Sequence, residues 1–156
     1  MTIAEIVLDE SLNNIRLAPE IERERAIAVQ DLLYRNVFQS GETNAPCRLC
    51  LSLQNRAVRF DLAEKNGGET ADFCISLSPF RRLIKDYFLV CESYYKTARR
   101  ASHAHIEAID MGRRALHDEA AALLKTKLSE RGIKTDLPTA RRLFTLICVL
   151  HIRIIY

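Results

Sequence analysis

The segment that decides the fold is residues 47–77, with the sequence CRLCLSLQNRAVRFDLAEKNGGETADFCISL. Three runs within it alternate apolar and polar side chains, namely 49–53, 58–62 and 73–77. Such alternation is typical of half-buried strands. The intervening residues 54–56 (Gln-Asn-Arg) and 66–68 (Asn-Gly-Gly) favour tight turns. We therefore predict a small antiparallel β-meander that buries one of its two faces.

The residues before the meander indicate one strand and one helix. Residues 3–8 are typical of a short strand, and Pro19 is expected to begin a helix that extends to about Asn36. Glu20, Glu22 and Glu24 would lie in its first turn, where the helix dipole favours acidic side chains. The inward side of this helix is predicted to carry Ala26, Val29, Leu32 and Leu33.

Three more helices are expected after the meander. Ser78-Pro79 combines a favoured N-cap with proline at the first helical position, and apolar residues then recur with a helical period through residue 98. Ser102 begins the next helix, which should end near Gly132, and residues 136–138 begin the last. A block of strands followed by a block of helices favours an α+β fold. We expect a single domain over residues 1–156, with an N-terminal helix and three C-terminal helices packed on one face of the meander.

Composition and charge limit the class of protein. A chain of 156 residues that is 48% hydrophobic and 28% charged, with 5 Gly and 4 Pro, is typical of a globular domain and excludes disordered and collagenous classes. The first 77 residues contain 8 Lys and Arg against 12 Asp and Glu, and the remainder contain 15 against 8. The second half is therefore basic and favours acidic proteins, phosphorylated ligands or, more weakly, nucleic acid.

The sequence predicts a cytoplasmic location and no membrane partner. The first ten residues contain three acidic residues and no Lys or Arg, unlike a secretory signal. The longest apolar stretch, residues 143–152, is about half of the ~20 residues that a spanning helix needs. We interpret it as a buried helix.

The cysteines do not form a convincing metal or nucleophile pattern. Cys47 and Cys50 have the spacing of half a zinc site, but no second such pair follows, and three residues along a strand would place them on opposite faces. Cys91 and Cys148 fall in the middle of apolar helices, away from the cations or histidines that activate a thiol. We expect no metal site, no cofactor and no catalytic cysteine.

Four Arg-Arg pairs lie in the basic half of the chain: Arg81-Arg82, Arg99-Arg100, Arg113-Arg114 and Arg141-Arg142. Guanidinium groups bind phosphates and carboxylates bidentately, so converging pairs would form an anion site. Adjacent helical residues point about 100° apart, which predicts that each pair gives at most one arginine to a site. The alternative is that these arginines lie on solvated faces and pair with Glu92, Glu107 or Glu119.

Three titratable residues interrupt or border the apolar stripe of the helix that begins after Ser102. Asp110, Arg113 and His117 lie close to the direction defined by the apolar positions of that helix. Burying such side chains requires partners. One interpretation is a structural network that reaches Glu22 and Arg25, and the other is a polar pocket in which Arg113 orients an anion and His117 exchanges a proton.

Three long blocks, residues 76–95, 106–117 and 140–151, resemble the alphaproteobacterial uncharacterised protein family 0262. Residues 21–26, Ile-Glu-Arg-Glu-Arg-Ala, resemble the first helix of the same family. The similarity covers nearly the whole chain. It implies a bacterial cytoplasmic single-domain protein, and it transfers no catalytic residue.

The sequence thus predicts a non-enzymatic interaction module whose basic helical half binds an acidic protein or a phosphorylated ligand. The candidate binding residues are Arg81, Arg82, Lys85, Asp110, Arg113, Arg114, His117, Arg141 and Arg142. The alternative is a small-ligand sensor or enzyme that uses the Asp110, Arg113 and His117 pocket, and the third hypothesis is a weak RNA-associated factor. No specific DNA partner is expected. A homodimer formed through the exposed face of the meander stays open.

Overall fold

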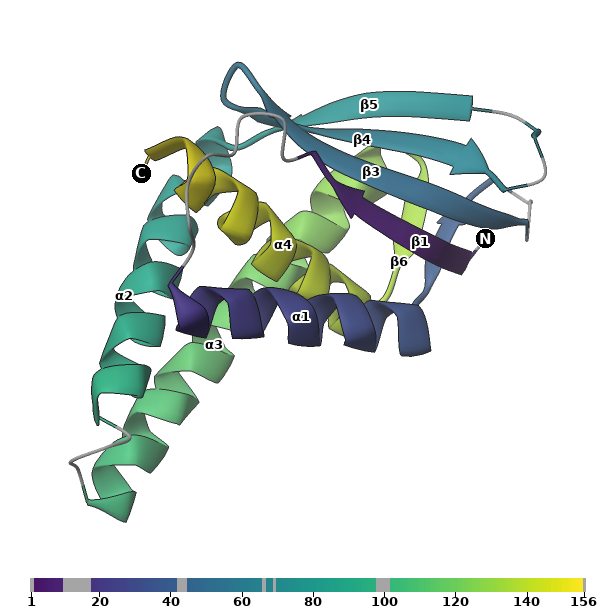
Figure 1. The fold of residues 1–156 in the computed structure, drawn as a ribbon. Helices are drawn as coiled ribbons and strands as arrows, with labels where there is room; N and C mark the ends of the chain where they lie inside the picture. Colours follow the sequence, from purple (N-terminus) through teal and green to yellow (C-terminus); the bar gives the residue numbers. More distant parts are fainter. Residues whose placement is uncertain are drawn as a thin grey trace.

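The computed structural model describes residues 2–9, 18–41, 45–65, 67–68, 70–97 and 102–155. The strands are β1 (Thr2–Leu8), β2 (Phe38–Ser40), β3 (Pro46–Gln54), β4 (Ala57–Glu64), β5 (Thr70–Ser76) and β6 (Ile133–Thr135). The helices are α1 (Pro19–Tyr34), a 3₁₀ turn (Ser78–Phe80), α2 (Arg81–Thr97), α3 (His103–Glu130) and α4 (Leu137–Ile155). The α+β class and the order of the long elements are confirmed (Figure 1).

The predicted meander is present as β3, β4 and β5, which pair antiparallel. Gln54 pairs with Ala57, and the two residues between them, Asn55 and Arg56, both have positive φ, 49° and 64°. Positive φ at both central positions is the geometry of a tight hairpin turn whose twist matches the strands. The second predicted turn includes Asn66, which lies outside the described residues.

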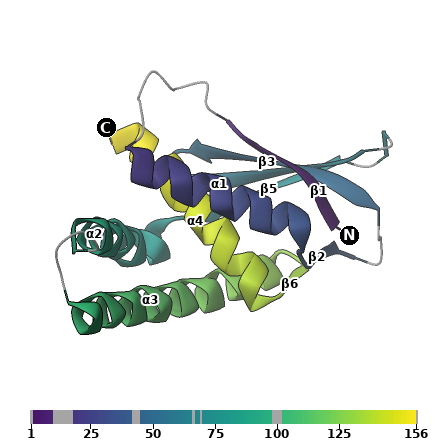
Figure 2. The ribbon, with the colours of Figure 1, turned by 60° about the horizontal axis from the view of Figure 1, so that its bottom comes forward.

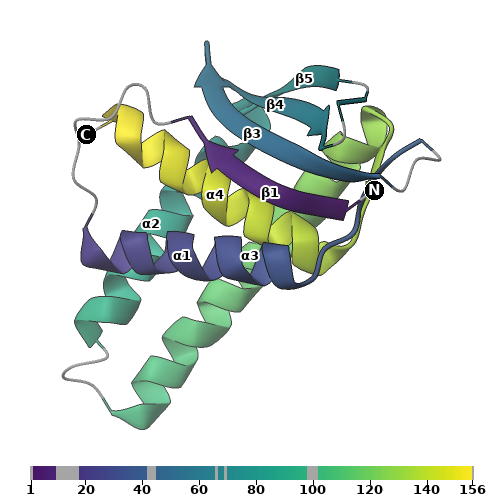
Figure 3. The same cartoon turned by 45° about the vertical axis from the view of Figure 1, so that its right-hand side comes forward.

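The four-stranded sheet is mixed, with the order β1-β3-β4-β5, and not purely antiparallel as predicted. β1 pairs parallel to β3, so that Val7 lies beside Cys50 (Figure 3). Between these strands the chain passes through α1, and a crossover of this kind returns it in the original direction. The alternation of apolar residues along a strand carries no information about its direction, so the sequence pattern left this undecided.

A second sheet, formed by β2 and β6, was absent from the prediction. Each strand has three residues, and they pair antiparallel with Phe38 opposite Thr135. Three residues are too few to establish a period of two. This pair joins the segment after α1 to the segment between α3 and α4.

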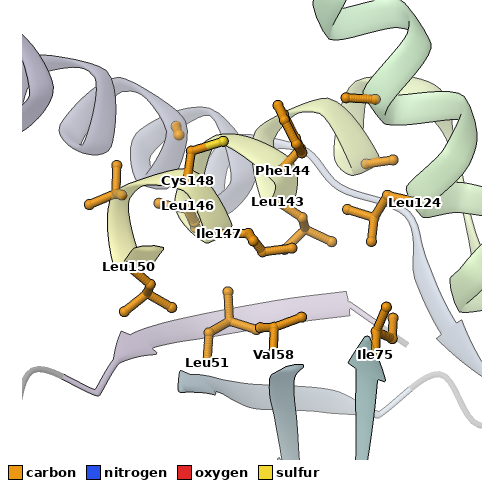
Figure 4. Close-up of a cluster of buried hydrophobic side chains, with 14 of the residues drawn as sticks. Leu51, Val58, Ile75, Leu124, Leu143, Phe144, Leu146, Ile147, Cys148 and Leu150 are labelled. Atoms are coloured by element: carbon orange, nitrogen blue, oxygen red, sulfur yellow. The ribbon is translucent and has the colours of Figure 1, made fainter. Parts of the chain in front are cut away.

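All four helices lie on one side of the large sheet, with α4 directly beneath it (Figures 1 and 2). Every residue from Leu143 to Leu150 is buried, which confirms the interpretation of this apolar stretch as a buried helix. The side chains of Leu143, Ile147 and Leu150 point toward the sheet (Figure 4). On the sheet they face Leu51, Val58 and Ile75. Burying each Leu or Ile contributes about 1.5–3 kcal/mol.

The helix boundaries largely follow the predicted signals. The hydroxyl of Ser102 accepts a hydrogen bond from the backbone N–H of His105, and Gly132 beyond α3 has φ +77°. At the start of α4, the backbone N–H of Thr139 donates to Oδ1 of Asp136 at 2.9 Å. These are the N-cap and C-cap positions that the sequence indicated.

The inward side of α1 differs from the prediction. The buried residues of the helix are Ile21, Glu24, Ala28 and Leu32. Leu32 was expected there, but Ala26 is exposed, Val29 is half-buried and Leu33 is 46% exposed. The buried face is displaced from the predicted one, and it includes the carboxylate of Glu24, whose hydrogen-bond partner Arg113 lies on α3.

Candidate functional site

A cavity of about 270 Å³ lies where α1, α3 and α4 meet. From α1 it is lined by Glu24, Ile27, Ala28 and Asp31. From α3 it is lined by Asp110, Arg113, Arg114 and His117. From α4 it is lined by Arg141, Arg142 and Thr145. Six of the nine candidate binding residues predicted from the sequence therefore line one cavity.

The other three candidates, Arg81, Arg82 and Lys85, are exposed on the first turn of α2. Arg82 forms ion pairs with Asp86 on its own helix and with Glu119 on α3. Asp86 and Glu119 border a different groove, of about 420 Å³, between α2 and α3. These three cations do not contribute to the cavity lined by α1, α3 and α4. The predicted pair Arg99-Arg100 lies outside the described residues.

Both arginines of two Arg-Arg pairs line the cavity, so the prediction of at most one per pair is wrong. The cavity is bordered by three helices, and a long arginine side chain can extend around its own helix. Arg113 and Arg114 thus reach the cavity from α3, while Arg141 and Arg142 reach it from α4. The 100° rule describes the direction of the Cα–Cβ bond, and it does not fix the position of the guanidinium group.

The polar network of α3 reaches α1 through Glu24, a residue that the prediction did not name as a partner. Nη1 of Arg113 donates a hydrogen bond to Oε1 of Glu24 at 3.0 Å, and Glu24 is 7% exposed. The guanidinium carbon of Arg113 also lies 5.1 Å from the ring centroid of Tyr94. Glu22 and Arg25, the predicted partners, form an ion pair with each other along α1. Ile21 and Ala28, which lie three residues before and four residues after Glu24, are the apolar neighbours from which its burial could have been predicted.

Each of the other three arginines of the cavity also has a carboxylate partner. Arg114 pairs with Asp110 one turn away at 3.0 Å. Arg141 on α4 pairs with Asp118 on α3. Nε of Arg142 lies 3.3 Å from Oδ2 of Asp31 on α1, and its Nη1 donates to the carbonyl of Pro138 at 2.9 Å. The arginines are therefore held in place by partners from all three helices.

Three residues that line the cavity each have a buried side-chain nitrogen with no hydrogen-bond partner within the described part of the chain. These nitrogens are Nε2 of His117, Nε of Arg141 and Nε of Arg142. For Arg142 the contact with Asp31 is an ion pair without hydrogen-bond geometry at Nε. Leaving one such buried group unsatisfied costs about 1–3 kcal/mol. Three of them in residues that line one cavity indicate a place where a hydrogen-bonding ligand would be accommodated after a small side-chain movement.

His117 is neutral at neutral pH in this arrangement. Burial, followed by the nearby positive charges of Arg113 and Arg141, lowers its pKa from 6.5 to about 4, while Asp118 acts in the opposite direction. The imidazole ring is stacked on the ring of Tyr87 from α2, with 5.4 Å between centroids. This contact fixes the plane of the ring at the edge of the cavity.

Four cysteines, Cys47, Cys50, Cys91 and Cys148, lie in environments that raise the thiol pKa and disfavour the thiolate. Burial raises the pKa of Cys91 to about 11, and it raises the pKa of Cys148 well above its usual range. On β3, Cys47 is buried and Cys50 is half-buried. Among the described residues there is no group of three or more His, Cys, Asp or Glu side chains that could hold a metal ion. No helix in the described ranges is long and apolar enough to span a bilayer.

Comparison with known proteins places the chain in a family. A model described as Uncharacterised protein family (UPF0262) matches residues 1–153. A relative from Rhizobium meliloti is 47% identical over 154 residues, which cover 98% of this chain and 96% of the relative. A relative from Rhizobium etli is 45% identical over 152 residues, covering 97% and 95%. One from Brucella canis is 45% identical over 153 residues, covering 97% and 94%.

These three relatives each carry the name of UPF0262 proteins, and no solved structure matches the chain. The resemblance seen in residues 76–95, 106–117 and 140–151 is therefore confirmed over nearly the full length. All six predicted residues that line the cavity fall within these blocks. The chain belongs to the Uncharacterised protein family (UPF0262).

Proposed function

We propose that this protein binds a small ligand carrying an oxyanion, a phosphate or a carboxylate, in the cavity between α1, α3 and α4. The observation that carries the proposal is the group of three buried nitrogens, on His117, Arg141 and Arg142, that have no hydrogen-bond partner within the described residues. An oxyanion accepts several hydrogen bonds at once and is stabilised by the positive guanidinium groups. No apolar ligand would satisfy these nitrogens.

The size and lining of the cavity favour a small molecule. Its volume of about 270 Å³ is close to the lower end of the usual range for ligand pockets, roughly 300–1,000 Å³. Ile27 and Ala28 provide an apolar wall on α1, and Thr145 adds a hydroxyl from α4. Four arginines and three carboxylates line the cavity, and a fourth carboxylate, Asp118, pairs with Arg141 beside it.

Binding, rather than catalysis, is the activity that the side chains support. Cys91 and Cys148 stay protonated because burial raises the pKa of both thiols. His117 has a pKa of about 4, which makes it a weak base at neutral pH. The small-ligand alternative from the sequence is therefore retained as a binding site.

An acidic protein on the basic helical half is the second candidate function. It is favoured by the charge of residues 78–156, which contain 15 Lys and Arg against 8 Asp and Glu. The ion pairs weaken this candidate, because Arg82, Arg114 and Arg141 are each paired with a carboxylate. The same ion pairs also neutralise arginines of the cavity, so what favours the cavity is its three buried nitrogens without a partner in the described residues, rather than a surplus of charge.

The test uses matched variants of two paired arginines. Arg141 and Arg82 form ion pairs with neighbouring residues of α3, Asp118 and Glu119, but only Arg141 lines the cavity. Titration with sulfate, inorganic phosphate and oxalate, followed by NMR shifts, should show binding that Arg141→Gln weakens about tenfold or more. Arg82→Gln should bind like the wild type.

Equal losses in the two arginine variants would mean that the anions respond only to surface charge, and would overturn the proposal. Mass spectrometry of the protein under native conditions adds an independent measurement. A small anion that co-purifies with the wild type and is lost from Arg141→Gln would identify the physiological ligand. An acidic protein that competes with sulfate and is released by Arg82→Gln would favour the second candidate instead.

A further inference from the structure

His117 occupies a special position in the proposed site. Its side chain is 8% exposed, it lines the cavity, and its Nε2 is one of the three buried nitrogens without a partner in the described ranges. The stacking of its ring on Tyr87 restricts how far the imidazole can turn away. A ligand in the cavity therefore lies beside a neutral imidazole whose buried Nε2 has no hydrogen-bond partner in the described ranges.

The groups around His117 come from every helix packed against it. They are Arg113 and Asp118 on α3, Arg141 on α4, Tyr87 on α2, and Glu24 on α1, which is bound to Arg113. The two arginines oppose protonation of the ring, because a second positive charge beside them would be repelled. Asp118 favours protonation, but its own carboxylate is engaged by Arg141.

An oxyanion between these groups would reverse their influence on His117. Its negative charge would offset the fields of Arg113 and Arg141, and its oxygens would accept a hydrogen bond from a protonated Nε2. A neutral imidazole donates from Nε2 in only one of its two tautomers, and it lacks the positive charge that strengthens the hydrogen bond to an anion. A bound oxyanion therefore raises the pKa of His117 and favours the protonated ring.

We infer that His117 contacts the bound oxyanion through Nε2 and takes up one proton from solvent as the anion binds. This inference rests on the proposed function. The step is balanced: the anion and one proton enter together, one N–H bond forms on the imidazole, and no bond in the ligand breaks. The consequence is an anion site whose affinity increases as the pH falls.

The sign and size of the pH dependence follow from linkage. Without the anion the pKa of His117 is about 4, and with the anion it is higher. Between these two values the complex holds one more proton than the free protein, so the affinity rises about tenfold for each unit by which the pH falls. Above the pKa of the complex, both states are neutral at His117 and the affinity is independent of pH.

The experiment measures proton uptake directly. Calorimetric titration of the wild-type protein with sulfate, in buffers of different ionisation enthalpy between about pH 5 and pH 8, gives the number of protons taken up per anion. Sulfate is the probe because its own charge does not change in this range. Oxalate, titrated at the upper end of the range, tests whether a planar carboxylate behaves like the tetrahedral anion.

We expect uptake that approaches one proton per sulfate at the acidic end, and that disappears in His117→Gln. The matched control is His151→Gln. His151 lies on α4 with a lowered pKa and a buried Nδ1 that also has no partner in the described ranges, but it does not line the cavity. Proton uptake by this variant should equal that of the wild type.

NMR titration of the wild-type His117 ring, with and without sulfate, tests the inference without any substitution. The pKa should rise from about 4 when sulfate is bound. Sulfate binding with no proton uptake, or uptake that survives in His117→Gln, would overturn the inference while leaving the proposed function standing. A failure of both sulfate and oxalate to bind would overturn the proposed function together with it.

Discussion

Arg113 on α3 and the buried carboxylate of Glu24 on α1 are joined by a 3.0 Å hydrogen bond between positions 89 residues apart in the chain. The side chains are 26% and 9% exposed, so the pair is largely shielded from solvent. It connects two helices that both pack against α4 and that together border the cavity. The polar network foreseen on α3 is thus also one wall of the candidate site.

Removing Arg113 should destabilise the protein. Arg113→Met leaves the Glu24 carboxylate buried without its guanidinium partner, which is expected to cost about 3 kcal/mol of unfolding free energy. The double variant Arg113→Met, Glu24→Leu should recover most of this loss, because an apolar pair replaces the ion pair. Urea unfolding of both variants measures the difference. A single variant as stable as the wild type would show that the pair has no structural role.

The stability of the protein should fall as the pH decreases from about 6.5 to 4. His117 has a pKa of 6.5 when unfolded and about 4 when folded, so the unfolded state binds more protons between these values. A shift of this size corresponds to a loss of roughly 3 kcal/mol of unfolding free energy. The loss is absent above the pKa of the unfolded state and is complete below the pKa of the folded state. Unfolding experiments across this range should show a smaller decrease for His117→Phe. An identical decrease would assign the pH dependence to other groups.

Shortening a leucine side chain on the buried face of α4 should destabilise the protein far more than shortening one on the exposed side of α1. Leu143 is 0% exposed beneath the sheet, whereas Leu33 is 46% exposed. Leu143→Ala leaves a cavity in the core and should cost about 2–5 kcal/mol. Leu33→Ala makes the same chemical change inside a helix and should cost less than about 1 kcal/mol. Thermal unfolding of the two variants compares them, and similar losses would contradict the burial of α4.

Nucleic acid should bind weakly and lose affinity steeply with salt. The chain has a formal net charge of +3, and several arginines of its basic half are paired with carboxylates. Few cations are therefore free to neutralise phosphates and release counterions. Fluorescence anisotropy with duplex RNA and DNA should give no sub-micromolar affinity at ~200 mM salt. Tight binding at that salt concentration would support the RNA-associated hypothesis.

Much of the local structure could be predicted from short stretches of sequence. The alternation in residues 47–77 identified β3, β4 and β5, because successive side chains of a strand point to opposite faces. Ser102 and Gly132 marked the ends of α3, because backbone groups at helix termini need a capping partner or a positive φ. These signals depend only on neighbours in the chain, and the structure agrees with them.

The side chain of Asn36 makes contacts that signals from neighbouring residues do not predict. Asn36 was expected to lie at the end of α1, and its side chain does more than end a helix. Its Oδ1 accepts a hydrogen bond from the backbone N–H of Ile3, and its Nδ2 donates to the carbonyls of Ile3 and Leu32. These hydrogen bonds connect the end of α1 to β1, the strand that pairs parallel to β3. No periodicity in residues 3–8 contains the direction of that pairing.

By itself, then, the sequence determined the α+β class, the meander, the three C-terminal helices and the unusual polar residues of α3. Only the tertiary structure decided that β1 is parallel, that β2 and β6 pair, and that Glu24 is the partner of Arg113. It also decided that Arg113, Arg114, Arg141 and Arg142 converge on one cavity. The physical reason is that periodicity and capping act over one or two turns, whereas a site between helices depends on how distant segments pack and where long side chains reach.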